Sequence, residues 1–89
     1  MNQETQDLFA TPEFQRLPAA KAQYLKEMIL TMEGRSMNEK IQVLLSYGFK
    51  MKNSGLSLTS AEASMIMPVL EKNLTPEERA QLKQITRFL

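Results

Sequence analysis

The chain has 89 residues, which is enough for one domain with one modest hydrophobic core. It contains no cysteine, which excludes disulfides, thiol catalysis and zinc thiolates, and no histidine, the commonest metal ligand and neutral-pH base. Eleven Lys and Arg residues against ten Asp and Glu residues give a net charge of +1, so the overall charge does not favour nucleic acid or anionic membranes. We therefore predict a single domain over residues 1–89 without a metal or cofactor.

The N-terminal segment is predicted to form only short helical elements. Residues 1–10 form either a short helix or a frayed segment, because they contain few apolar side chains. Thr11 is a suitable N-cap, Pro12 a suitable first helical residue, and Pro18 ends this turn by Leu17. The segment lacks the basic and apolar regions of a secretory signal, and no apolar run in the chain approaches the roughly 18 residues of a membrane span. We therefore expect a cytoplasmic protein with no membrane contact.

A longer helix is predicted from Ala19 to Glu33. Its apolar residues recur at the i, i+3, i+4 and i+7 spacing of one helical face: Leu25, Met28, Ile29 and Met32. Gly34 follows as a natural helix stop.

The next helix is predicted to begin at a capping box formed by Ser36 and Glu39. Its narrow apolar face consists of Met37, Ile41, Leu44, Leu45 and Gly48. Two interpretations stay open beyond this point, because Gly48 is a poor interior helix residue. Either the helix continues to Lys52, or it stops at Gly48 and residues 49–52 are extended.

Two further helices begin at similar Leu-Thr-x-x-Glu capping boxes, Thr59 with Glu62 and Thr75 with Glu78. Pro68 lies inside the first of these helices, where it removes a hydrogen bond and predicts a kink. The last helix has Leu82, Ile85 and Leu89 on one face. The whole pattern predicts an all-α fold, a small bundle of four to five short helices with a central helix near residues 37–52.

The predicted central helix has a wider apolar arc than a surface helix needs, because Val43, Tyr47 and Met51 extend its narrow face on one side. One interpretation is that neighbouring helices pack on both sides of it. The other is that this edge contacts a partner, since Tyr and Met are enriched at interfaces. We therefore take Val43, Tyr47 and Met51 as interface candidates.

The last helix also carries a basic stripe, Arg79, Lys83 and Arg87, at i, i+4 and i+8. These cations could contact phosphate or an acidic partner. They could equally serve the helix dipole, opposite Glu77 and Glu78 at its start.

The turn and cap residues also carry a resemblance to a known group of proteins. The segments are Phe14-x-x-Leu17-Pro18, Gly34-Arg35-Ser36, Gly55-Leu56-Ser57-Leu58-Thr59, and Asn73-Leu74-Thr75-Pro76-Glu77-Glu78-Arg79. Together they resemble small uncharacterised all-helical proteins of Gram-positive anaerobic bacteria. The resemblance implies a bacterial helical domain and no particular activity.

No combination of acid, base and nucleophile is visible in the sequence, so an enzyme is not expected. The predicted role is a non-enzymatic interaction or adaptor domain that binds another protein or a second copy of itself. The alternative is a nucleic-acid-associated accessory protein that uses the basic helices.

Overall fold

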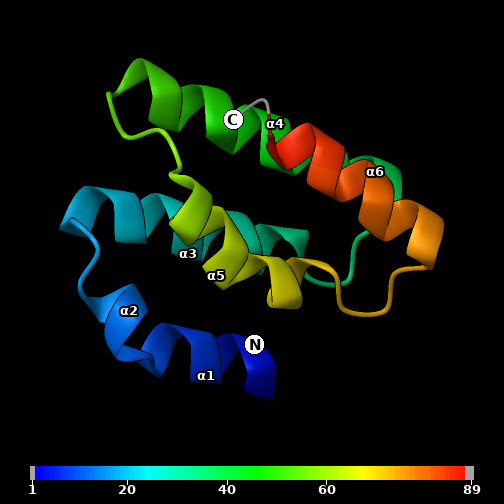
Figure 1. Ribbon diagram of the computed structural model, residues 1–89, viewed down its shortest axis with the longest axis horizontal. Helices are drawn as coiled ribbons and strands as arrows, with labels where there is room; N and C mark the ends of the chain where they lie inside the picture. The colour runs from blue at the N-terminus through cyan, green and yellow to red at the C-terminus, as the bar shows by residue number, and fades with distance from the viewer. Residues whose placement is uncertain (1, 88–89) are drawn as a thin grey trace.

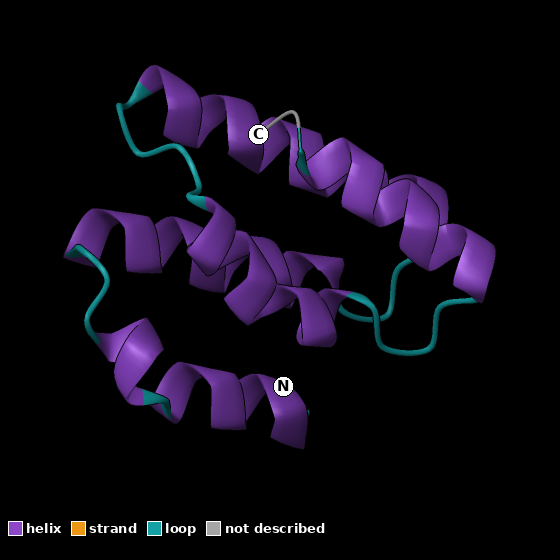
Figure 2. Ribbon diagram, viewed as in Figure 1, coloured by secondary structure: helices purple, strands orange, loops and turns teal. Residues whose placement is uncertain are grey.

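The computed structural model describes residues 2–87, and within them every regular element is a helix (Figure 2). The helices are α1 (Gln3–Ala10), α2 (Pro12–Gln15), α3 (Ala19–Met32), α4 (Met37–Asn53), α5 (Ser60–Leu70) and α6 (Pro76–Thr86). Five of them have eight residues or more, and α2 is a single turn of four residues. The all-α prediction is confirmed, and the N-terminal segment forms a short helix.

The helices lie in three tiers (Figure 1). In that view α1 and α2 are at the bottom, α3 and α5 in the middle, and α4 and α6 at the top. The most extensive contact joins α3 to α4, and α4 also packs against α6. Helix α5 instead packs against α1 and α3. Helix α4 therefore has neighbours on two sides, α3 and α6. It lies in an outer tier, however, and not at the centre of the bundle as the sequence predicts for the helix near residues 37–52, because α3 and α5 occupy the middle tier.

The three predicted capping boxes are all present. At the start of α4, the Glu39 N–H donates to Ser36 Oγ, and the Ser36 N–H donates to Glu39 Oε1. The same reciprocal pair forms between Thr59 and Glu62 and between Thr75 and Glu78. Each box satisfies N–H groups that a helix start leaves without partners.

Helix ends also follow the local sequence. After α4 the Gly55 N–H donates to the Lys52 carbonyl and the Leu56 N–H to the Met51 carbonyl, the pattern of a Schellman motif. This motif needs a left-handed residue, and Gly55 has a φ of 72°. Gly34, which follows α3, has a φ of 73°.

The core joins all six helices. Its buried members are Leu8, Phe14, Leu25, Met28, Ile29, Met32, Leu44, Met51, Ile66, Leu70 and Leu82. The four residues predicted as the buried face of α3 are all among them, each at most 2% exposed. The 3.6-residue period was therefore sufficient to place the buried face of this helix.

Helix α4 runs without interruption through Gly48 to Asn53, so residues 49–52 are helical and not extended. Its buried residues are Leu44, Gly48 and Met51, whereas Ile41 and Leu45 are only half-buried. The centre of the buried face thus lies further toward Met51 than the predicted narrow face, because both α3 and α6 pack on this helix.

Two predictions are not tested by the described structure. Leu89, expected on the apolar face of α6, lies outside the described residues. Helix α5 continues through Pro68 and ends two residues later at Leu70. The kink expected at Pro68 stays a prediction.

Candidate functional site

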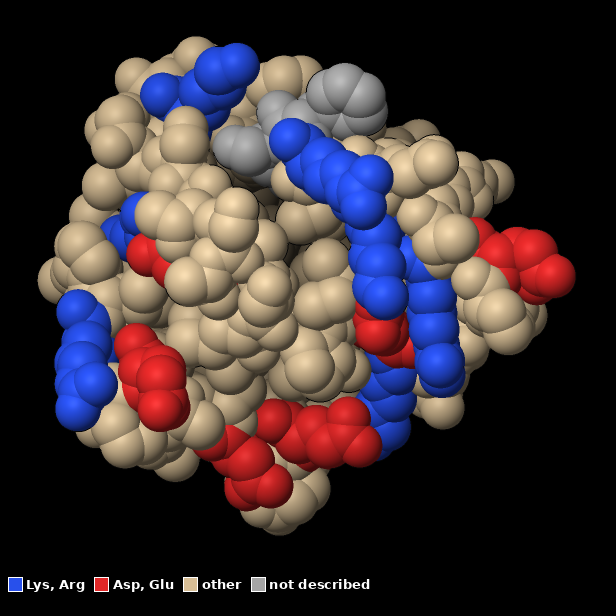
Figure 3. All heavy atoms as spheres, in the orientation of Figure 1, with Lys and Arg blue, Asp and Glu red and all other residues tan. Residues whose placement is uncertain are grey.

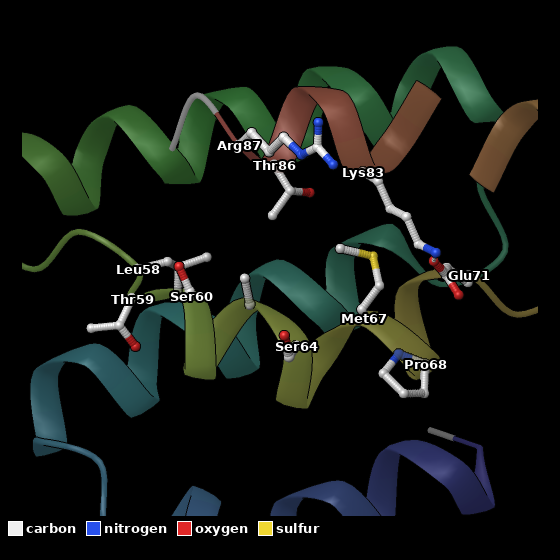
Figure 4. A pocket seen from close by; sticks show the side chains of 11 residues that line it. Leu58, Thr59, Ser60, Ser64, Met67, Pro68, Glu71, Lys83, Thr86 and Arg87 are labelled. Carbon is white, nitrogen blue, oxygen red and sulfur yellow. Dashed lines mark ion pairs between the residues drawn. The ribbon is translucent and has the colours of Figure 1, made fainter. Parts of the chain in front are cut away.

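The surface has a groove of about 560 Å³ between α5 and the C-terminal half of α6 (Figure 4). The groove is lined by Leu58, Thr59, Ser60, Ala63, Ser64, Met67, Pro68, Glu71, Lys83, Thr86 and Arg87. The space-filling view shows the surface hollowed here, with basic side chains along one side of the hollow (Figure 3). Its volume lies within the range of about 300–1,000 Å³ found for ligand pockets.

The groove exists because its two walls belong to different parts of the bundle. Helix α6 packs on α4, whereas α5 packs on α1 and α3. The two helices are joined by a short connection over residues 71–75, in which Asn73 adopts a left-handed φ of 65°. The backbones of the two helices therefore lie apart (Figure 1), and their facing side chains line the groove.

The α5 wall combines apolar and hydroxyl groups. Ala63 and Met67 are half-buried and lie one helical turn apart, while Ser60 and Ser64 are exposed beside them. On the α6 wall, the hydroxyl of the buried Thr86 donates to the Leu82 carbonyl at 2.8 Å. Since that donor is already used, the wall offers few free polar groups of its own apart from its charged side chains.

Three charged side chains line the groove. Lys83 Nζ lies 3.7 Å from Glu71 Oε1, an ion pair across the groove that is too long for a hydrogen bond (Figure 4). Glu71 Oε1 is buried and has no hydrogen-bond partner among the described residues. Arg87 is exposed and forms no ion pair with another described side chain. The groove therefore carries one surplus positive charge.

The structure places the three residues of the predicted basic stripe in different surroundings. Lys83 and Arg87 line the groove, but Arg79 does not. Arg79 is exposed in the first turn of α6, where its N–H donates to the Thr75 carbonyl. The even i, i+4, i+8 spacing of the stripe in the sequence therefore does not give its three members the same surroundings.

The interface candidates on α4 lie against the core. Met51 is 1% exposed, and Val43 and Tyr47 are half-buried and packed on the buried cluster. The Tyr47 ring also has Lys50 Nζ 4.9 Å from its centre, a cation–π distance. In this arrangement the three side chains make contacts within the chain. The exposed apolar side chain of α4 is Phe49, at 57%.

A buried ion pair holds the first turn of α5, which forms part of one groove wall. Lys21 Nζ donates to Glu62 Oε1 at 2.8 Å and to the Ser57 carbonyl at 3.0 Å. The two charged side chains are only 10% and 15% exposed. Burial raises the pKa of Glu62, but hydrogen bonds from Lys21 and the Thr59 N–H outweigh it and hold the pKa below its usual value.

Sequence reasoning missed Lys21 and the α5 wall. Lys21 stands four residues before Leu25, in line with the apolar face of α3, and a lysine at that position is a signal of a buried partner. The lining residues of α5 give no such signal, because a groove depends on where a second helix lies.

No protein-family model, curated protein or solved structure matches this chain. Between residues 2 and 87, no helix has the length and apolar character needed to cross a membrane. The groove therefore has to be interpreted from its own chemistry.

Proposed function

We propose that this protein is a small non-enzymatic interaction domain that binds a segment of another protein in the groove between α5 and α6. The observation that carries the proposal is the groove itself, with apolar side chains and charges on the walls of two helices that pack on different neighbours. Recognition sites for protein segments commonly combine apolar, polar and charged side chains in this way. The cytoplasmic location expected from the sequence belongs to the same proposal.

The test is affinity capture from the native cell extract with a variant that fills the groove. Ser64 is exposed and lines the groove, so Ser64→Trp places a large ring inside it. Ser46 is also exposed but lies on α4 and does not line the groove, so Ser46→Trp is the matched control. We expect a protein partner that the wild type and Ser46→Trp retain and that Ser64→Trp loses. A partner retained by all three proteins would contradict binding in the groove.

The alternative function is contact with nucleic acid through α6, supported by the exposure of Arg79, Lys83 and Arg87. Three cations are few for tight binding at physiological salt, and Lys83 already lies beside Glu71. Fluorescence anisotropy with random duplex DNA at about 0.15 M salt tests this function, the salt range over which phosphate contacts weaken strongly. Tight binding that is lost when all three residues are changed to Gln would favour the alternative over the protein partner.

A further inference from the structure

We propose that the occupant of the α5–α6 groove is an amphipathic helix of a partner protein, with a carboxylate placed against Arg87 and apolar side chains against Ala63 and Met67. This inference rests on the proposed function and names the chemistry of the partner.

The backbone chemistry of the groove selects a helical occupant. Both walls are helices, whose backbone groups are mostly paired internally. The exception in α5 is the Ser64 carbonyl, because Pro68 has no N–H to donate to it. A single carbonyl is not the edge that an extended strand needs for pairing. An occupant that covers the groove must satisfy its own backbone groups, which a helix does. Helix α5 is 11 residues long, or about 16 Å, which matches three turns of a partner helix.

The spacing of the apolar side chains on α5 also fits a helical occupant. Ala63 and Met67 are four residues apart on α5, so they form a row along the groove with Leu58 at its start. A partner helix with apolar residues at i, i+3, i+4 and i+7 presents a complementary row. The nearby hydroxyls of Ser60 and Ser64 are exposed and suit the polar rim of such a contact.

The charges of the groove determine which sign of charge the partner carries. The Lys83–Glu71 pair occupies one end of the groove. In the view of Figure 4, Arg87 stands beside Thr86 on the α6 wall, about one turn beyond Lys83, and its guanidinium extends back over the groove toward Lys83. Arg87 has no anionic partner among residues 2–87, and a guanidinium pairs with a carboxylate through two parallel hydrogen bonds. An acidic residue of the partner fits against Arg87.

The experiment uses three synthetic helical peptides with the same Leu face, whose polar face carries Glu, Gln or Lys. Amide chemical shifts of the ¹⁵N-labelled chain locate the site, and titration gives the Kd. We expect shifts at Ser60, Ser64, Met67 and Thr86, and about fivefold tighter binding of the Glu peptide than of the Gln peptide, equivalent to about 1 kcal/mol. Arg87→Gln should abolish this preference, whereas Arg79→Gln, on the same helix but outside the groove, should preserve it.

The other outcomes separate the inference from the proposed function. Equal binding of the Glu and Gln peptides in the groove overturns the acidic preference and leaves a protein-binding groove. Stronger binding of the Lys peptide overturns the charge assignment. Absence of binding by all three overturns the helical occupant, and the Ser64→Trp capture then decides the function independently. Larger shifts of the same amides with duplex DNA overturn the inference in favour of nucleic acid.

Discussion

Helices α5 and α6 are both eleven residues long and both begin at a Leu-Thr-x-x-Glu capping box. The Thr N–H to Glu Oε1 distances are 2.9 Å in the first box and 3.0 Å in the second. The surroundings of the two glutamates differ. Glu62 also accepts from Lys21 at 2.8 Å, whereas Glu78 has no ion pair with another described residue. Equal local chemistry thus starts both helices, and only one of the starts is tied to the rest of the bundle by a buried charge.

The same contrast extends to how the two helices are held. Helix α5 packs on α1 and α3 and is anchored at its first turn by Lys21 from α3. Helix α6 packs on α4, and the fully buried apolar side chain that holds it is Leu82. Because the two helices depend on different neighbours, a groove lies between them.

The largest effect is expected from Leu82→Ala, which removes a side chain that is 0% exposed. Such a change costs about 2–5 kcal/mol of unfolding free energy. Since Leu82 is the main anchor of α6, amide hydrogen exchange should accelerate more in α6 than in α5. Ile66→Ala, at 0% exposure in α5, is the matched control and should not loosen α6 selectively. Equal acceleration in both helices would show that α5 and α6 open together.

The next effect compares the two glutamates. Gln keeps the capping box, so Glu62→Gln and Glu78→Gln both test the charge alone. We expect Glu62→Gln to cost about 1.5–3 kcal/mol, because it removes a charged hydrogen bond to the buried Lys21. Glu78→Gln should stay within about 0.5 kcal/mol, because Glu78 has no ion pair with another described residue and Gln keeps its cap. Urea unfolding of both variants measures the difference.

The assignment of this loss to one ion pair is checked with Lys21→Met and the double variant. In a double-mutant cycle, contacting residues show an interaction energy of about 0.5–3 kcal/mol. A strictly additive double variant would contradict a direct contribution from the Lys21–Glu62 contact.

A smaller effect is expected at the threonines. Thr59 and Thr75 each accept a backbone N–H at the start of their helix, at 3.1 and 3.2 Å. Substitution of either residue by Ala should therefore cost about 1 kcal/mol, with nearly the same value for both helices. Thermal unfolding of the two variants measures this. A markedly larger loss for Thr59 would mean that its hydroxyl, and not only Glu62, contributes to the buried pair.

The smallest effect is the pH dependence. Burial raises the pKa of Glu62, and the hydrogen bonds from Lys21 and the Thr59 N–H lower it further than burial raises it, so the net pKa is below the usual value of about 4.3. A carboxyl with a lowered folded pKa contributes stability above its unfolded pKa and loses it as the pH falls through the folded pKa. The stability difference between the wild type and Glu62→Gln should therefore shrink as the pH falls below about 4.3. Urea midpoints across this range measure it, and a constant difference would contradict the lowered pKa. The hydrogen bond from Ser36 lowers the pKa of Glu39 in both proteins, so it does not affect the comparison.

Much of the fold could be predicted because its signals are local. A capping box needs only residues three positions apart, and all three boxes form as the sequence indicates. The buried face of α3 follows from the 3.6-residue period, and the ends of α3 and α4 follow from glycines that adopt a left-handed φ. These features depend on the nearest few residues of the chain.

The candidate site could be predicted only in part. The sequence showed that Arg79, Lys83 and Arg87 share one face of a helix, but only Lys83 and Arg87 line the groove. The opposite wall, with Ser64, Met67 and Glu71, gave no signal, because its role depends on the separation of two helices.

The sequence by itself determined that this chain is helical, where most helices start and stop, and which face of α3 is buried. Tertiary structure decided that Lys21 pairs with Glu62 across 41 positions of sequence, and that Tyr47 and Met51 face the core while Phe49 faces solvent. It also decided that α5 and α6 enclose a groove. The physical reason is how far along the chain each feature is determined. Caps and periodicity are properties of one helix, whereas burial and ion pairing depend on which other helices lie against it.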